Sequence, residues 1–225
     1  MFTGIVAAIG RISTITPVTP ATHSVSTASA TPDSGKADNT ALPGLRLTID
    51  AGVLAMEDVA LGDSIAINGA CMTVISKQDQ QFCVDVSRES LNLTTGLDQP
   101  GPVNLEKALT LADRLGGHLV SGHVDGLGTV VTFEPVNESY ELVIAAPKNL
   151  AKYLAYKGSV VVNGVSLTVN KVTDHPDHCI FSINLIPHTI QVTTLKHLVA
   201  GSKVNLEIDL IARYCERMLS TQHSS

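Results

Sequence analysis

An internal duplication limits the fold of this chain more than any other feature of its sequence. Residues 62–74 (GDSIAINGACMTV) resemble residues 157–169 (KGSVVVNGVSLTV), and each block has an Asn-Gly pair at its centre. Blocks that recur in the same order indicate two copies of one structural unit. Further matches pair Thr3–Val6 with Ser121–Val124, Ser90–Thr95 with Thr189–Thr194, and Val103–Glu106 with Val204–Glu207.

Each copy has the pattern of short strands joined by polar turns. Ser64–Ile67 and Ser159–Val162 both run into Asn-Gly, which is a strong signal for a tight hairpin turn. Short strands at regular spacing predict a sandwich or a barrel. The chain is expected to begin a strand at its first residues. Further strands are expected at 45–50, 81–87, 128–133, 140–145, 179–184 and 203–208.

Short helices are predicted at 51–58 and 148–156, and another at 109–115, where Gly116-Gly117 would end it. Residues 16–44 are rich in Thr, Ser, Pro and Ala, and they can bury too little apolar surface to offset the conformational entropy lost on ordering. We therefore expect a mobile insertion. The tail from Leu210 places apolar residues on one helical face after Asp209, a candidate N-cap. Packing on its own domain and self-association fit this helix equally well.

Composition excludes several classes of protein. Hydrophobic residues make up 44% and charged residues 16%, and no apolar run has the roughly 20 residues that cross a bilayer. The formal net charge is -6 with no basic stripe, which argues against nucleic acid. The N-terminus lacks the pattern of a signal peptide, so a cytoplasmic location and free thiols are expected. His175, His178 and Cys179 form too weak a motif for a metal, and a polar hairpin tip is favoured there.

The polar residues shared by the two copies indicate two related pockets. Small hydroxyl and thiol groups recur at matched positions and suit the edge of a neutral heterocycle. The copies also differ: Cys71 corresponds to Ser166, Ile5 to His123, and Ala108 to Asp209. Two identical sites would not need these differences, whereas a donor pocket and an acceptor pocket would. Histidine is the side chain best suited to carry a proton near neutral pH, so His123 is the natural candidate for a proton carrier.

Together these segments resemble the riboflavin synthase family. The resemblance rests on the start MFTGIV, on NGACMTV at 68–74 and on GGHLVSGH at 116–123. It rests also on YKG at 156–158, NGVSLTV at 163–169, LIPHT at 185–189 and VNLEID at 204–209. It covers nearly the whole chain except residues 16–44 and the last few.

The resemblance implies an all-β fold of two tandem Greek-key six-stranded β-barrels, with short helices and a C-terminal α-helix. The barrels would span residues 1–115 and 116–209, and an oligomerisation helix and tail would span 210–225. It implies a homotrimer whose active site lies between the first barrel of one subunit and the second barrel of its neighbour. Lumazine synthase is a further candidate partner.

The implied reaction is the dismutation of two 6,7-dimethyl-8-ribityllumazine molecules. One gives four carbons to the other, which yields riboflavin and 5-amino-6-(ribitylamino)uracil, with no cofactor and no metal. The chemistry needs removal of a proton from the C7 methyl of one ring and a nucleophile or water at C7 of the other. The ring stabilises the carbanion itself, so pairing and orientation of the two rings are the protein's main tasks.

The resemblance also implies site residues. Those in or near catalysis would be Phe2, Ser64, Cys71, His123 and Asp209. The substrate-binding residues of the first copy would be Gly4, Ile5, Val6, Cys71, Met72, Thr73, Asp85, Val86, Ser87, Arg88, Glu89 and Ser90. Those of the second copy would be Gly122, His123, Val124, Lys157, Ser166, Leu167, Thr168, Ile186, Pro187, His188 and Thr189.

Two other functions are weighed against the enzyme. A non-catalytic lumazine or flavin carrier of the same fold would bind one ligand and lose the polar groups of its second pocket, but both copies keep theirs here. A flavin reductase module would need a nicotinamide-binding region or a Gly-rich phosphate loop, and the sequence has neither.

Overall fold

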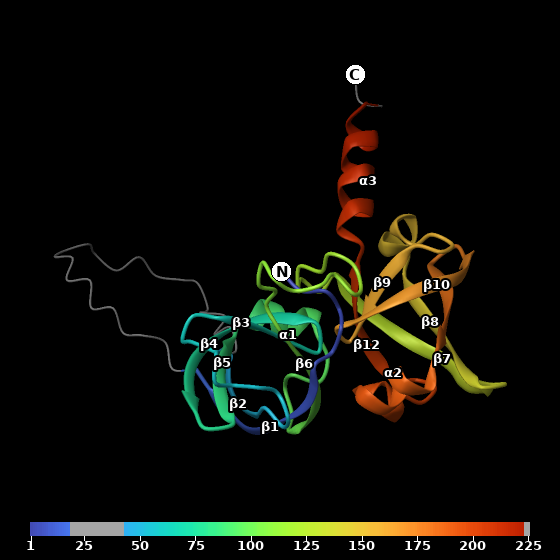
Figure 1. Ribbon diagram of the computed structural model, residues 1–225. Helices are drawn as coiled ribbons and strands as arrows, with labels where there is room; N and C mark the ends of the chain where they lie inside the picture. The colour runs from blue at the N-terminus through green and yellow to red at the C-terminus, as the bar shows by residue number, and fades with distance from the viewer. Residues whose placement is uncertain (19–42, 223–225) are drawn as a thin grey trace, which may run out of the picture.

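The computed structural model describes residues 1–18 and 43–222, and these form two six-stranded barrels followed by a helix (Figure 1). The expected insertion at 16–44 falls almost entirely outside the described residues. The first barrel contains β1 (Ala8–Pro17), β2 (Leu45–Asp50), β3 (Ser64–Ile67), β4 (Ala70–Gln78), β5 (Gln81–Val86) and β6 (Gly101–Lys107). The second contains β7 (Gly126–Val136), β8 (Ser139–Pro147), β9 (Ser159–Val162), β10 (Val165–Asp174), β11 (His178–Leu185) and β12 (Lys203–Ile208).

Both barrels are closed and antiparallel, and they have the same strand order. Around the first barrel it is β1-β2-β5-β4-β3-β6, and around the second β10-β11-β8-β7-β12-β9, which is the same cycle with each strand replaced by its repeat counterpart. The last strand of each barrel lies beside the third, as in a Greek key. The predicted double barrel is therefore confirmed.

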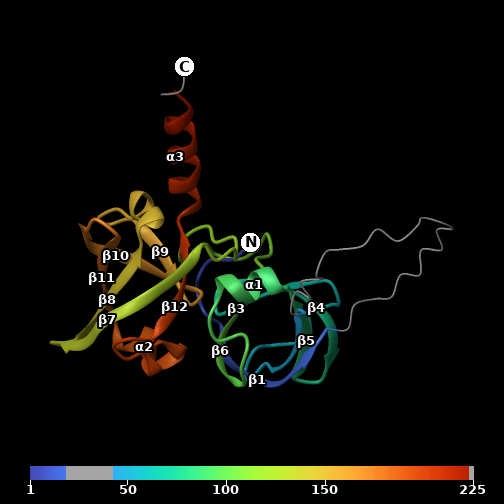
Figure 2. The same cartoon turned by 180° about the vertical axis from the view of Figure 1, so that it is seen from behind.

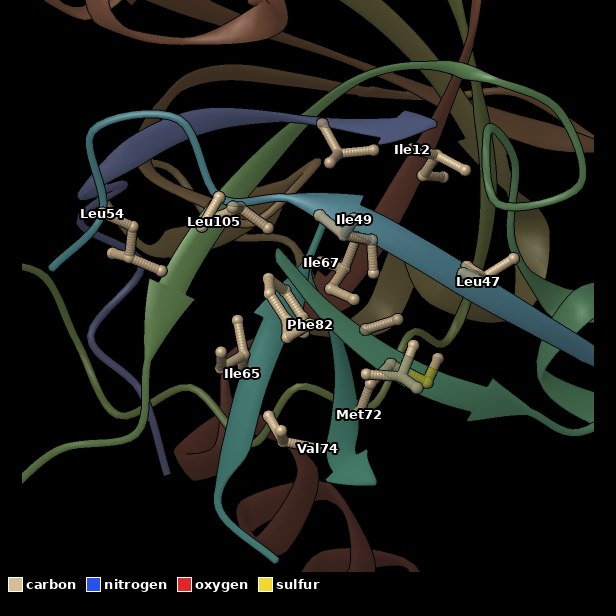
Figure 3. Close-up of a cluster of buried hydrophobic side chains, with 14 of the residues drawn as sticks. Ile12, Leu47, Ile49, Leu54, Ile65, Ile67, Met72, Val74, Phe82 and Leu105 are labelled. Carbon is tan, nitrogen blue, oxygen red and sulfur yellow. The ribbon is translucent and has the colours of Figure 1, made fainter. Parts of the chain in front are cut away.

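Alternating apolar residues fill each barrel. In β5, Phe82, Val84 and Val86 are buried while their neighbours face outward. These three side chains belong to one core with inward residues of β1, β2, β3, β4 and β6, many of which Figure 3 shows around Phe82. This period of two is what a sheet with one buried face requires. A separate core of the same kind fills the second barrel.

The two Asn-Gly turns join the barrels to each other. Asn68 and Asn163 have φ of 47° and 48°, as a type I′ hairpin turn requires. A Cβ on Gly69 would lie 2.8 Å from the backbone N of Gly164, so only glycine lets the turns touch.

Two buried asparagines of the last strands tie these turns across the interface. Asn104 Nδ2 donates to the carbonyl of Asn163 at 2.8 Å, and Asn205 Nδ2 donates to that of Asn68 at 3.0 Å. The Oδ1 atoms accept from the backbone N–H groups of Thr194 and Thr95, both at 2.7 Å. The four asparagines (Asn68, Asn104, Asn163 and Asn205) thus form a reciprocal amide network between the repeats.

The helical segments differ from the prediction. Residues 51–58 form turns and no helix, and Lys77 Nζ donates to the carbonyls of Met56 and Val59 at 2.6 and 2.8 Å. Residues 109–115 are also turns, pinned by bonds from Thr110 to Asp113. A 3-10 helix, η1 (Lys148–Tyr153), covers part of the helix predicted at 148–156.

Three short helices were not predicted. They are α1 (Arg88–Leu93), α2 (Pro187–Val192) and the 3-10 helix η2 (Thr194–His197). Ser87 caps α1 by accepting from the N–H of Ser90, and Pro187 opens α2 at its first turn.

The C-terminal helix α3 (Leu210–Gln222) was predicted correctly, including its cap: Asp209 Oδ1 accepts from the N–H of Ile211 at 2.9 Å. Arg213 binds Asp125 at 2.8 Å and ties the base of the helix to the second barrel. One turn further on, Glu216 binds Lys152 and Tyr153 of η1, and α3 then projects past both barrels, as two opposite views show (Figures 1 and 2).

Loss of the Asn104 side chain should destabilise the whole chain. Asn104→Ala leaves the N–H of Thr194 and the carbonyl of Asn163 buried without partners, and we expect a loss of about 2–5 kcal/mol of unfolding free energy. Urea unfolding measures this, with Asn149→Ala on the exposed face of η1 as control. Equal midpoints for the two variants would contradict a role of the amide network in stability.

Candidate functional site

The residues that precede the first strand of each barrel cross to the other barrel. The carbonyl of Gly4 accepts from the N–H of Ser166 at 2.8 Å, and the carbonyl of Gly122 accepts from the N–H of Cys71 at 2.8 Å. Val6 packs on the core of the second barrel and Val124 on that of the first. The expected strand at the N-terminus is wrong for this reason: residues 3–7 form this crossing, and only Phe2 pairs, with Val120, as an isolated bridge.

A buried glutamate holds each crossing segment. Glu106 accepts from the N–H and hydroxyl of Thr3 at 2.6 and 2.7 Å and from the N–H of Gly4 at 3.0 Å. Glu207 accepts from Ser121, at 2.7 Å twice, and from Gly122 at 3.0 Å in the same way. Burial raises the pKa of both carboxyls, while the donated hydrogen bonds act in the opposite direction.

Glycine is required where the segments cross. Gly122 has φ of +80°, and a Cβ there would lie 2.7 Å from Cys71 Cβ and 2.9 Å from Phe2 Cε2. Phe2 is fully buried at this point, between the barrels. The backbone therefore lies directly against the strand that carries Cys71.

This crossing forms a hollow of about 170 Å³ at the first barrel. Cys71 is half-buried in it, and His123 is exposed at it. The lining residues are Ala70, Cys71, Met72, Glu89, Ser90, Leu93, Thr94, Gly122, His123 and Val124. We call this hollow the first pocket.

The repeat places corresponding residues at the second barrel. Gly4 and Ser166 meet there as Gly122 and Cys71 meet in the first pocket. We call this place the second pocket, and its residues are the repeat counterparts: Val165, Ser166, Leu167, His188, Thr189, Val192, Thr193, Gly4, Ile5 and Val6. Gly4–Val6 and Gly122–Val124 were predicted from the first and second copies of the sequence, and each segment lies against the barrel of the other copy.

Some predicted residues lie outside the first pocket. Ser64 lines a separate hollow of about 650 Å³ with Lys107 and Ala108. Asp85 is on the outside of the barrel, where Arg46 binds it at 2.7 Å and lowers its pKa. Thr73 and Thr168 are exposed, and Val86 belongs to the core of the first barrel. Met72 and Leu167 are core residues that also border the first and second pockets.

Others lie on the short helices and turns. Ser87 is the cap of α1, and Arg88 is exposed on that helix. Ile186 and Pro187 begin α2. Lys157 has φ of +62° and its Nζ donates to Asn170 Oδ1 at 2.9 Å.

His118 is a polar residue of the second pocket that the sequence analysis did not single out. Its Nδ1 lies 2.7 Å from Ser166 Oγ, and its Nε2 is buried with no hydrogen-bond partner among the described residues. Burial lowers its pKa from 6.5, and the charge of Asp209 acts the other way. Its only signal in the sequence was its place in the GGHLVSGH segment.

Other hollows are larger than the first pocket. The one around Ser64 is bordered by the crossing segment of its own repeat, at Thr3, Ile5 and Ala7. Hollows of about 580 and 640 Å³ lie between η1 and α3. None of these three receives a crossing segment from the opposite repeat. We therefore take the two pockets at the crossing as the candidate site.

The described residues contain no group of three or more His, Cys, Asp or Glu side chains that could hold a metal. His175 and His178 stack with their ring centroids 4.5 Å apart, in the turn between β10 and β11. All four cysteines are free thiols. Within the described part of the chain no helix is long and apolar enough to span a membrane.

The comparisons with known proteins agree with this arrangement. The family model for the lumazine binding domain matches residues 3–108 and 121–209, one match for each barrel with its leading segment. The fold is therefore a pair of lumazine-binding domains.

Named relatives narrow the class further. The chain is 39% identical to the riboflavin synthase of Photobacterium phosphoreum over 221 residues, which are 97% of this chain and 89% of the relative. It is 42% identical to that of Bacillus subtilis over 177 residues, 78% of this chain and 80% of the relative. The chain belongs to the riboflavin synthase family, which is a family of enzymes.

Among solved structures, the LumP protein in complex with riboflavin is similar, with a TM-score of 0.71 at 26% identity. The match covers 92% of this chain and 99% of that one.

A methyl group at the crossing should disrupt the first pocket. Gly122→Ala must push residues 122–124 away from Cys71, and we expect activity to fall on the order of 10–100-fold. Gly126→Ala is the matched control, because its Cβ would meet only Leu150 and Pro147, at 3.8 and 4.0 Å. Steady-state turnover measures the effect, and equal activity of the two variants would contradict the proposed pocket.

Proposed function

We propose that this protein catalyses the dismutation of two 6,7-dimethyl-8-ribityllumazine molecules into riboflavin and 5-amino-6-(ribitylamino)uracil, the last step of riboflavin biosynthesis. One observation carries the proposal. A single chain has two crossings built alike from repeated segments, yet different in their polar residues: the first forms a hollow, and the second is its repeat counterpart. Such a pair suits a reaction in which two molecules of one compound take different roles.

The proposed chemistry needs a proton acceptor and close pairing of the rings. We assign proton transfer to His123, whose imidazole is exposed at the first pocket beside Cys71. Cys71 contacts the ring or acts as nucleophile, and Asp209 orients a hydroxyl or a water. Phe2 acts by packing, since it fills the space between Gly122 and Val120. Ser64 keeps a proposed role near catalysis, although it lines another hollow.

The pockets support a catalytic unit made of more than one chain. About 170 Å³ is below the roughly 300–1,000 Å³ of ordinary ligand pockets, so the first pocket needs a further wall to enclose a ribityl-bearing ring. Ile211 and Tyr214 on α3 are 65% and 62% exposed, which is costly for a monomer. A homotrimer joined through α3, with the first barrel of one subunit facing the second barrel of its neighbour, accounts for both observations.

The alternative is a non-catalytic lumazine or flavin carrier. The likeness to LumP favours it, because that protein is solved in complex with riboflavin and with 6,7-dimethyl-8-(1'-D-ribityl) lumazine. Identity argues for the enzyme: it is 26% to LumP and 39% to the Photobacterium phosphoreum synthase. Ser166 and Thr189, the counterparts of Cys71 and Ser90, also keep polar side chains at the second pocket.

Turnover separates the two functions. The purified protein with 6,7-dimethyl-8-ribityllumazine alone should form riboflavin without any added cofactor, with two lumazines consumed for each riboflavin. Absorbance and fluorescence follow both compounds. Tight binding without product would favour the carrier. A protein that does not bind the lumazine and forms no product would overturn the assignment of the ligand.

Charge on α3 should break the assembly. The double variant Ile211→Glu and Tyr214→Glu should sediment as a monomer and lose turnover, while Val199→Glu, which alters an equally exposed residue far from α3, should stay trimeric. Sedimentation velocity measures this. A wild-type chain that sediments as a monomer would contradict the trimer.

Adding lumazine synthase to the same experiment tests the predicted association, and cell fractionation tests the cytoplasmic location.

A further inference from the structure

His118 is brought onto Ser166 by an unusually close backbone approach. A Cβ on Gly117 would lie 2.1 Å from the carbonyl oxygen of Thr3 and 2.8 Å from Ser166 Oγ, so only glycine passes here. The N–H of His118 then donates to that same Thr3 carbonyl at 3.1 Å. The ring is therefore fixed between the first crossing segment and β10.

The imidazole makes one hydrogen bond and has one unused nitrogen. Nδ1 lies 2.7 Å from Ser166 Oγ, while Nε2 is buried and has no partner in residues 1–18 and 43–222. Buried polar atoms are nearly always paired, so an exception needs an explanation. Burial lowers the pKa of the ring and favours its neutral form, in which Nδ1 bonds Ser166 as donor or as acceptor according to the tautomer.

The first pocket has no such arrangement. Ser166 corresponds to Cys71, and within the described residues no imidazole is hydrogen-bonded to Cys71. Asp209, whose charge reaches His118, corresponds to Ala108. The two pockets thus differ at this position: the second has a hydroxyl held by an imidazole near a carboxylate, and the first has a thiol and an alanine.

We propose that His118 is a positioning residue that fixes the Ser166 hydroxyl in one orientation toward the ring bound in the second pocket. The bond to His118 uses either the O–H or one lone pair of that hydroxyl, and the remaining donor or acceptor is left for the ligand. The two pockets then present different polar groups to two identical molecules, and this difference assigns the molecules their separate roles. The inference rests on the proposed function and names the residue that makes the second pocket distinct.

The test compares His118→Phe, which keeps a ring of similar size without nitrogen, with His118→Asn, whose amide reaches the position of Nδ1. We expect kcat of His118→Phe to fall at least tenfold with little change in KM, and His118→Asn to recover much of that loss. Ser166→Ala should fall as far as His118→Phe, and the double variant no further, because both remove one interaction. His197→Phe, on an exposed histidine of η2, is the control and should match the wild type.

A purely structural role predicts otherwise. His118→Phe and His118→Asn would then fail alike, their losses would multiply with that of Ser166→Ala, and unfolding midpoints would fall in parallel. That result would overturn the proposal. Titration of the protein with riboflavin distinguishes failure of this proposal from failure of the proposed function. If the wild type makes no product, His118→Phe should still weaken riboflavin binding at one of two sites and spare the other. Equal weakening of both sites would again overturn it.

Discussion

The structure depends on the reciprocal hydrogen bonds that join the two Asn-Gly turns. Each buried asparagine of a last strand binds the turn of the opposite barrel, and Gly69 lies against Gly164 with no room for a side chain. Buried amides that are fully paired specify one arrangement, because any shift leaves several polar groups unpaired at once. This network fixes how the barrels meet. The crossing segments and both pockets are built around that contact.

On this symmetric frame the chain places a few unsymmetric residues. The glutamates that hold the crossing segments are equivalent, and so are the glycines beside Cys71 and Ser166. At the pockets themselves the copies differ in facing side chains, such as Ile5 and His123. A frame of this kind lets one fold present the same ligand with two chemical environments, since backbone contacts are kept and only the facing groups change.

Much of the fold could be predicted because the repeat and its period of two are local signals. Asn68-Gly69 sets a turn by backbone preference alone, and Phe82, Val84 and Val86 show their common face in the sequence. The crossing could not be predicted, because nothing near Gly4 indicates that its partner is Ser166. The turns at 51–58 were missed for a similar reason: Lys77, distant in sequence, binds their carbonyls.

The candidate site was predictable in its residues but not in its grouping. Cys71 and His123 were both predicted, and the structure brings them to one pocket from different copies. His118 was missed because its environment, and not its position in a motif, makes it unusual. Burial and the contact with Ser166 arise only when Gly117 passes close to Thr3.

The crossing also has a consequence for the order in which the chain folds. Glu106 holds Thr3 and Gly4, but the strand that Gly4 lies against carries Ser166, which comes much later in the chain. During synthesis this segment emerges well before Ser166 and finds its place only after that part of the second barrel has been made. The first barrel can close its sheet early, since domains fold as units. Its leading segment docks only when the second barrel exists, and contacts so distant in sequence form slowly. The pockets are accordingly the last part of the molecule to be completed.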